Sequence, residues 1–355
     1  MPDIRKLISV LSCEKSAAQK INYLKYAFSG RARRLAYRPV VISVVATSNC
    51  TLSCDMCPTH SRNVPKNYKW RQTAARDMDL ALFKRGLDMF PEALEVHIIG
   101  SGEPLLNKDF FEMVRYASDK RKMDVKTFSN GTTIRPNIAG ILESGLDGIT
   151  VSINGHTAGE FSRMTGMPPK VFDDIVAGTK ELIEAKKKTR PEFRVKLSFI
   201  IDKTNYSGMP EMAALALRLG ADHVFFCNFL PCLYGDLTPD KRVITTSDRD
   251  IVEFIRKTKQ SLDPSVRGKF DFPPVIDTSS AENRCRCHFE QVRFDGEGNV
   301  SSCSMMLLNM EGSGHIDAPD CWNSIFLQEM RGKFITGDGI EELCLYCPGN
   351  KGVEA

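Results

Sequence analysis

The sequence lacks several features that would assign a protein to a broad class at once. No apolar run reaches the roughly 18 residues that a membrane-spanning helix needs. The N-terminus has no uninterrupted apolar segment of a signal peptide, because Lys6, Glu14 and Lys15 interrupt it. The net charge of +4 over 355 residues is too small to indicate a nucleic-acid partner. We therefore expect a cytoplasmic protein that binds neither membranes nor nucleic acids.

A regular alternation of strand and helix patterns is present from residue 40 onward. Apolar and β-branched runs predict strands over 40–46, 94–99, 123–128, 147–153, 194–201 and 222–227. Helical patterns separate these strands over roughly 79–90, 107–120, 136–145, 169–188 and 207–219. Such alternation predicts parallel βαβ units. Six units are two short of a complete (β/α)8 barrel, so we expect an α/β fold with a partial (β/α)6 TIM-like barrel.

The alternative fold is a flat, doubly wound sheet. No G-x-G-x-x-G motif follows the first predicted strand, so a dinucleotide crevice has no support. We divide the chain into an N-terminal helical segment (1–38), the barrel (39–240), a linker helix and loop (241–280) and a small cysteine-rich α+β domain (281–355). In the first segment, Ile21, Leu24 and Phe28 predict one apolar helix face.

Cysteine is plentiful, with 12 residues, and most of them are clustered. In a reducing compartment, clustered cysteines indicate metal binding or catalysis before disulfides. Cys50, Cys54 and Cys57 follow the first predicted strand with the spacing C-x3-C-x2-C. Three thiolates on a short loop can hold three irons of a [4Fe–4S] cluster and leave the fourth iron open to a ligand. The alternative is a zinc site with a distant fourth ligand, for which His60 is a candidate.

Polar segments also follow the next three predicted strands. The second strand leads into Gly100-Ser101-Gly102-Glu103-Pro104, the third into Ser129-Asn130-Gly131, and the fourth ends at Ser152 and Asn154. Barrel enzymes gather their chemistry at this end of the parallel strands. Glycines let the backbone approach a ligand closely, and Glu103 can accept hydrogen bonds from an amine.

In these segments the sequence resembles the radical S-adenosylmethionine enzymes. Cys50, Cys54 and Cys57 are similar to the defining loop of that family, and Gly100 to Pro104 resembles its GGEP segment. Ser101 stands where the second glycine is usual, and Met56 takes a place that is often aromatic. The resemblance covers about residues 40–230.

The resemblance implies a mechanism and a set of site residues. A [4Fe–4S] cluster on the three cysteines would bind S-adenosylmethionine, and its reductive cleavage would give a 5′-deoxyadenosyl radical that takes a hydrogen atom from a substrate. The electron would come from a low-potential donor of the flavodoxin or ferredoxin type. Glu103 would hold the methionyl amine. The implied cofactor-binding residues are Met56, Gly100, Ser101, Gly102, Glu103, Pro104, Ser129, Asn130, Ser152 and Asn154.

A second group of cysteines lies near the C-terminus. Apolar residues on both sides of Gly296 to Gly298 predict a β-hairpin with cysteines near its ends. Spacing alone leaves zinc and iron–sulfur equally open. The tail resembles the SPASM/twitch domains of radical S-adenosylmethionine enzymes, which implies one auxiliary [4Fe–4S] cluster. Its implied ligands are Cys285, Cys303, Cys344 and Cys347, with Cys287 as an alternative to Cys285.

The residues leave several functions open. The resemblance favours dehydrogenation of a small alcohol or sugar-like molecule, with the auxiliary cluster accepting an electron. Cys227 and Cys232 are candidate hydrogen donors, which would instead make the protein an epimerase. A peptide- or protein-modifying maturase is a further alternative, which we disfavour because only about 38 residues precede the first strand. A non-catalytic metal-binding scaffold is the alternative outside enzymology.

Overall fold

The fold is described here from a computed structural model, which covers residues 4–65, 67, 77–231, 237–303 and 314–355. Its main sheet has nine strands in the order β10-β9-β1-β2-β3-β4-β5-β6-β7. The strands are β1 Val41–Val45, β2 Glu95–Ile99, β3 Asp124–Ser129, β4 Gly148–Ser152, β5 Arg194–Ile201, β6 His223–Asn228, β7 Phe270–Asp271, β9 Gln291–Phe294 and β10 Val300–Ser301. A second sheet pairs β8 Val275–Ile276 with β11 Gly352–Val353.

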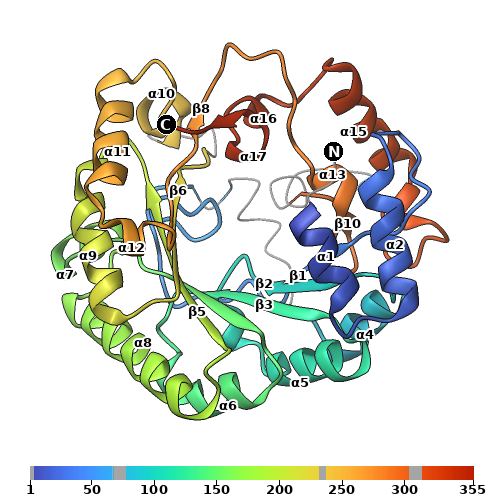
Figure 1. The fold of residues 1–355 in the computed structure, drawn as a ribbon, viewed down its shortest axis with the longest axis horizontal. Helices are drawn as coiled ribbons and strands as arrows, with labels where there is room; N and C mark the ends of the chain where they lie inside the picture. The colour runs from blue at the N-terminus through green and yellow to red at the C-terminus, as the bar shows by residue number, and fades with distance from the viewer. Residues whose placement is uncertain (1–3, 66, 68–76, 232–236, 304–313) are drawn as a thin grey trace.

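The first six strands lie side by side in chain order, and all of them are parallel. A doubly wound sheet reverses its strand order partway, so this consecutive order excludes the alternative fold. Figure 1 shows the sheet curving within an outer layer of helices as an open barrel, with α16 and α17 on its open side. The predicted partial barrel is confirmed.

Helices follow the strands and cover the outer side of the sheet. On the barrel they are α4 Leu80–Asp88, α5 Phe110–Arg115, α6 Ile138–Glu143, α7 Ala158–Thr165, α8 Pro169–Thr189, α9 Met209–Leu219, α10 Pro239–Arg242, α11 Arg249–Ser261 and α12 Pro264–Arg267. A π-helical turn, Tyr116–Lys120, extends α5, and 3-10 turns occupy Pro104–Leu106, Arg135–Asn137 and Tyr206–Gly208. Among the described residues, none of the helices is long and apolar enough to cross a bilayer.

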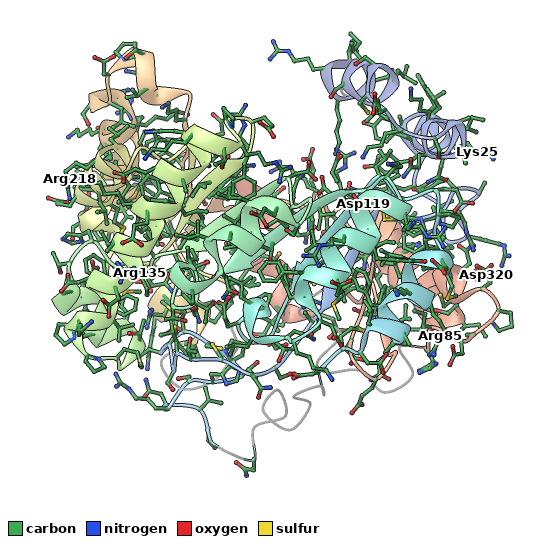
Figure 2. The ribbon with its side chains drawn as sticks, turned by 90° about the horizontal axis from the view of Figure 1, so that it is seen from below. Lys25, Arg85, Asp119, Arg135, Arg218 and Asp320 are labelled. Atoms are coloured by element: carbon green, nitrogen blue, oxygen red, sulfur yellow. The ribbon has the colours of Figure 1, made fainter. Side chains whose placement is uncertain are left out.

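Side-chain alternation gives the sheet two different faces. Ile42 and Val44 of β1 are fully buried in the main core beneath the helices, so Ser43 between them faces the inside of the barrel. We call this side the inner face. Charged side chains of the outer layer, such as Asp119, Arg135 and Arg218, lie on the outside of the molecule in Figure 2. The inner face is therefore the side of the sheet that the helical layer does not cover.

The N-terminal segment forms two helices, α1 Ile4–Ser12 and α2 Ala17–Phe28. The apolar face predicted for it is wrong, because Ile21 is 53% exposed and Phe28 is 68% exposed. The helix instead buries Gln19, whose amide donates to the backbone oxygens of Ala93 and Arg121 at 2.8 and 3.1 Å. Hydrogen-bonded polar groups, which a hydrophobicity pattern cannot register, therefore hold α2 in place together with Tyr23, which packs in an apolar cluster with Val40 and Leu94.

The linker and the tail both extend the barrel sheet. Strand β7 lies within 241–280 and pairs parallel with β6, so the parallel sheet continues past residue 228. The predicted hairpin is present as β9 and β10, and β9 also pairs parallel with β1. The tail is therefore attached to the barrel by a continuous hydrogen-bonded sheet. Its helices are α13 Cys287–Glu290, a 3-10 turn Cys321–Asn323, α15 Ile325–Thr336, α16 Glu342–Leu345 and α17 Pro348–Lys351.

Candidate active site

The loop that carries Cys50, Cys54 and Cys57 follows β1 and is held by local hydrogen bonds. The Cys57 amide donates to the Cys54 carbonyl at 2.9 Å, and the His60 amide donates to the Cys57 sulfur at 3.2 Å. Helix α7, which the sequence patterns did not reveal, supports the loop from outside. The Asp55 amide donates to the carbonyl of Met164, in the last turn of α7, at 2.7 Å.

The structure brings the three thiols of this loop together. Burial, together with the nearby Cys57 and Cys50 sulfurs, raises the pKa of Cys54 to about 12, because thiolates repel. Burial likewise raises the pKa of Cys50. Without a cation, the thiols of Cys50 and Cys54 hold their protons at neutral pH. A bound metal group would supply the positive charge that three adjacent thiolates need.

The glycine-rich loop after β2 packs directly on the cysteine loop. The Gly102 amide donates to the Thr47 carbonyl at 3.1 Å, and the Glu103 amide donates to the Asn49 carbonyl at 2.7 Å. A Cβ atom on Gly102 would lie 2.0 Å from the Asn49 carbonyl oxygen, so only glycine fits. Ser101 is half-buried beside it. The serine therefore stands at the motif position that has room for a side chain.

The Glu103 side chain is 1% exposed, and its carboxylate is hydrogen-bonded to neighbouring residues. Its carboxylate accepts from the Asn130 amide at 2.6 Å, the Ser129 hydroxyl at 2.9 Å and the Leu105 amide at 3.3 Å. Burial raises the pKa of Glu103 despite these donors. In this structure Glu103 and Ser129 join the loops after β2 and β3. Their binding of the cofactor stays a prediction.

Two asparagines from neighbouring strand ends reach the cysteine loop. The Asn130 side-chain amide donates to the Cys50 sulfur at 3.6 Å, and Asn154 hydrogen-bonds Cys54. Asn154 is 8% exposed, and its Oδ1 has no hydrogen-bond partner among the described residues. A buried acceptor without a donor beside a thiol fits a ligand that brings its own N–H or O–H groups. Ser152 lies half-buried nearby, with its hydroxyl 3.0 Å from that of Ser198.

The remaining predicted residues fall into different environments. Met56 is buried in an apolar cluster with Met164 and Phe229, and Pro104 is buried at the start of a 3-10 turn. Cys227 lies near the C-terminal end of β6 and is exposed to solvent, yet burial raises its pKa to about 11. This thiol is therefore accessible to solvent and stays protonated at neutral pH. Cys232 lies outside the described residues.

The cysteines of the tail also come together, at the other end of the barrel wall. Residues 285–290 lead into the N-terminal end of β9, whereas Cys50 follows the C-terminal end of the parallel strand β1. Burial, together with the Cys303 and Cys285 sulfurs, raises the pKa of Cys347 to about 12. Burial and the same neighbours raise the pKa of Cys344. The four predicted ligands of the second cluster therefore lie close together.

Asn350 joins three cysteines of this second group, which come from two segments of the chain. Its side chain accepts from the Cys285 amide at 3.2 Å and donates to the Cys344 carbonyl at 2.9 Å, while its own amide donates to the Cys347 carbonyl at 2.9 Å. Cys287 lies beside Cys285, and the hydrogen bond between them lowers the pKa of Cys285. The choice between these two ligands stays open. In the described ranges, no group of three or more His, Cys, Asp or Glu is placed to hold a single metal ion.

Several side chains on the inner face were not identified from the sequence. They lie mid-strand, where the alternation with buried neighbours is their only signal, and include His97, Lys126, Phe128, Lys196 and Arg293. Lys126 and His97 both pair with Glu95. Lys196 lies over the Phe225 ring at 5.5 Å from its centroid. The inner face thus combines aromatic surface with several cations.

Comparison with known proteins places these observations in a family. Residues 44–216 match the model of the radical SAM superfamily. The chain belongs to the radical SAM superfamily. Among curated radical SAM relatives, it is 30% identical over 205 residues to the tungsten-containing aldehyde ferredoxin oxidoreductase cofactor-modifying protein of Pyrococcus furiosus. It is 29% identical over 202 residues to the AdoMet-dependent heme synthase of Methanosarcina barkeri.

These alignments cover 55% and 56% of this chain and 51% and 53% of the two relatives, so the chain spans about half the length of the curated relatives it matches. Solved structures resemble the chain over more of its length. SuiB of Streptococcus suis has a TM-score of 0.64 at 15% identity, covering 93% of this chain and 77% of SuiB. The enzyme anSMEcpe with bound AdoMet also has a TM-score of 0.64 at 15% identity, covering 88% and 89%. The shared fold of these radical SAM proteins thus extends into the cysteine-rich tail.

Proposed function

We propose that this chain is an enzyme that cleaves S-adenosylmethionine reductively and begins radical chemistry on a substrate at the inner face of the barrel. The observation that carries the proposal is the convergence of Cys50, Cys54 and Cys57 with Asn130 and Asn154 on one rim. The thiols fit a [4Fe–4S] cluster, because the loop offers three ligands and leaves one position for a cofactor. The buried Oδ1 of Asn154 fits a cofactor with N–H or O–H donors.

The protein's own residues would orient the cofactor and limit its freedom. When bound, the cluster and S-adenosylmethionine supply an electron and a 5′-deoxyadenosyl group that removes a hydrogen atom. Gly102 brings the glycine-rich backbone against the cysteine loop, and Glu103 fixes the loops after β2 and β3 relative to each other. Such fixed positioning brings a reacting carbon close to a substrate hydrogen. A flavodoxin- or ferredoxin-type donor would deliver the electron.

We further propose that the net reaction is a two-electron oxidation of a small alcohol or sugar-like substrate. A substrate carbon that loses a hydrogen atom is oxidised by one electron, and loss of a proton and a second electron completes a dehydrogenation. The thiols of Cys285, Cys303, Cys344 and Cys347 lie at the opposite end of the barrel wall and fit a cluster that accepts this second electron. Residues 39–240 would thus start the radical, and residues 281–355 would accept the electron.

Anaerobic reconstitution tests both proposed clusters. The wild-type chain should bind about eight irons and form 5′-deoxyadenosine from S-adenosylmethionine with dithionite as reductant. Cys54→Ser should bind about four irons and form none, whereas Cys347→Ser should lose about four irons and still form it. Normal 5′-deoxyadenosine formation by Cys54→Ser would contradict the first cluster. Full iron content in Cys347→Ser would contradict the second.

Epimerisation is the second candidate, because Cys227 presents a protonated thiol at the inner face. A thiol can return a hydrogen atom to a substrate radical from the opposite side. Cys227→Ala should leave dehydrogenation of a screened set of polyols and amino sugars intact. If Cys227→Ala instead converts a product of inverted configuration into side products, and the wild type takes up solvent deuterium, the protein is an epimerase.

A further inference from the structure

Lys196 is a cation in the middle of β5 that the reaction described above does not use. Its neighbours Val195 and Leu197 are fully buried in the main core, so alternation along the strand turns Lys196 to the inner face. The side chain is half-buried, and its Nζ atom lies 5.5 Å from the centroid of the Phe225 ring. This contact agrees with the inward direction, because Phe225 also lies between two buried core residues of β6.

Lys196 has no ionic partner in the part of the chain that the structure describes. There, no carboxylate lies within ion-pair distance of its Nζ atom and no group accepts a hydrogen bond from it. Glu95 and Asp271 act on it only at longer range, since Glu95 pairs with Lys126 and Asp271 hydrogen-bonds His223. The pKa of Lys196 is lowered, chiefly by burial and by the charge of Lys126. A bound anion would offset both effects and keep the ammonium group charged.

The strand register places Lys196 in one row with three other side chains of the inner face. In order across β3, β4, β5 and β6, the row consists of Phe128, Thr150, Lys196 and His223. Phe128 is 44% exposed although β3 is a central strand, so the row is accessible from the solvent. An exposed aromatic ring can cover the C–H face of a sugar-like molecule, and a hydroxyl and an imidazole can hydrogen-bond its oxygens.

This row lies beneath the rim that carries the proposed cofactor site. Ser152 and Ser198 form the next inner-face pair toward the rim, and their hydroxyls are 3.0 Å apart. Two residues along a strand span about 7 Å, so Lys196 lies about that far below this pair. Asn154, which hydrogen-bonds Cys54, follows Ser152 by two residues. A small molecule anchored at Lys196 would therefore extend toward the rim where the proposed radical forms.

We infer that Lys196 is a specificity-determining residue that binds an anionic oxygen group of the substrate, a phosphate or a carboxylate. This inference rests on the proposed function, in which an alcohol or sugar-like substrate is oxidised at the inner face. A lysine ammonium is a compact charge with three donors, which suits a group of several negatively charged oxygens. The substrate class is thereby narrowed to hydroxylated molecules that carry a phosphate or a carboxylate.

Titration calorimetry with simple anions tests the inference on the reconstituted full chain in the presence of S-adenosylmethionine. Inorganic phosphate and acetate are the two probes, and the one that binds more tightly identifies the group. We expect Lys196→Met to weaken binding of that anion by about tenfold or more, because one charge-assisted contact is lost. Lys196→Arg keeps the charge and should retain most of the affinity. Lys180→Met removes a lysine that pairs with Glu184 on the outer helix α8, and this matched control should bind like the wild type.

The outcomes separate a failure of the inference from a failure of the proposed function. Equal anion affinities of wild type and Lys196→Met, or no saturable binding of either probe by the wild type, would overturn the inference while 5′-deoxyadenosine formation still supports the function. Equal losses in Lys196→Met and Lys196→Arg would also overturn it, because they would indicate lost packing instead of lost charge. Oxidation of a neutral polyol with the same KM in wild type and Lys196→Met would do so as well. A wild type that binds the anion through Lys196 but forms no 5′-deoxyadenosine would remove the proposed function, and with it the assignment of the anion to a substrate.

Discussion

At the scale of single residues, the glycine-rich loop shows why one substitution in a motif is tolerated and its neighbour is fixed. Ser101 is half-buried with room for its side chain, while a Cβ on Gly102 would meet the Asn49 carbonyl oxygen at 2.0 Å. Backbone contact between two loops decides this difference. The sequence shows only that a serine stands in a glycine position.

Gly102→Ala should therefore displace the glycine-rich loop from the cysteine loop. We expect the free energy of unfolding to fall by about 1–3 kcal/mol, because the methyl group overpacks against backbone that cannot move aside alone. Urea denaturation of the apo protein measures the change. Ser101→Ala is the matched control and should stay within about 0.5 kcal/mol of wild type. Equal stability of Gly102→Ala and Ser101→Ala would contradict the close packing.

Glu95 gives a pH-dependent prediction. Burial would raise its pKa, but the hydrogen bond and charge of His97 and the charge of Lys126 outweigh burial and lower it from 4.5 to about 2. Because the folded-state pKa is depressed, the stabilisation is complete above pH 4.5 and is lost as the pH falls through about 2. Glu95→Gln should cost about 2 kcal/mol at pH 7, after allowance for partial exposure.

Urea denaturation at pH 7 and pH 3 checks this prediction, and the difference between Glu95→Gln and wild type should narrow at pH 3. Glu112 pairs with Arg115 on the surface, where its side chain is 61% exposed, so Glu112→Gln should change little at either pH. A Glu95→Gln cost that is the same at both pH values would refute the assigned cause.

At the scale of elements, buried Arg331 holds the tail to the N-terminal segment. It lies in α15, is fully buried, and donates to the carbonyls of His288, Trp322 and Arg33 at 2.7–3.1 Å and to the Asn323 side chain at 3.1 Å. Its guanidinium also lies 4.3 Å from the Trp322 ring centroid. One side chain thus satisfies acceptors from three separate segments.

Arg331→Met should lower the free energy of unfolding by about 3 kcal/mol or more, because several buried acceptors would lose their donor. The measurements are urea denaturation and limited proteolysis, which should cut the tail sooner than in wild type. Arg256, which pairs with Glu253 on the exposed side of α11, provides the control variant Arg256→Met with a change near zero. Wild-type resistance of Arg331→Met to protease would show that the sheet contact between β9 and β1 alone secures the tail.

At the scale of the whole molecule, two groups of cysteines lie at opposite ends of one continuous sheet. The first follows β1, and the second surrounds the start of β9 and the end of β10, the strands that extend the sheet beyond β1. In both groups burial and neighbouring thiols raise the pKa of cysteines, to about 12 for Cys54 and Cys347, whereas the hydrogen bond with Cys287 lowers the pKa of Cys285. The thiols of Cys54 and Cys347 are therefore protonated at neutral pH.

Loading with iron and sulfide should consequently release protons and be favoured by higher pH. Raising the pH from 6 to 8 in a metal buffer should increase cluster occupancy, because a protonated thiol must lose its proton before it binds iron. Iron content and the visible absorbance of the clusters measure this. Removal of the clusters with a chelator should also lower the midpoint temperature of unfolding, since a bound group stabilises the folded state. Loading that does not depend on pH would contradict protonated thiols.

The sequence by itself determined the six consecutive βαβ units, the three-cysteine loop after the first strand, and the hairpin with cysteines near its ends. Each of these follows from a local pattern of strand periodicity, ligand spacing or turn residues, which needs no long-range information. It also determined the superfamily, because the cysteine loop and the glycine-rich segment occur in fixed order along the chain.

Only the tertiary structure decided how distant segments meet. Strand β9 pairs with β1, and α7 supports the cysteine loop. Ser129 and Asn130 donate hydrogen bonds to the Glu103 carboxylate. All of these are contacts between residues far apart in sequence. Arg331 is the clearest case. A single arginine in a helix carries no signal of its own, and its role comes from burial beside the carbonyls of His288, Trp322 and Arg33.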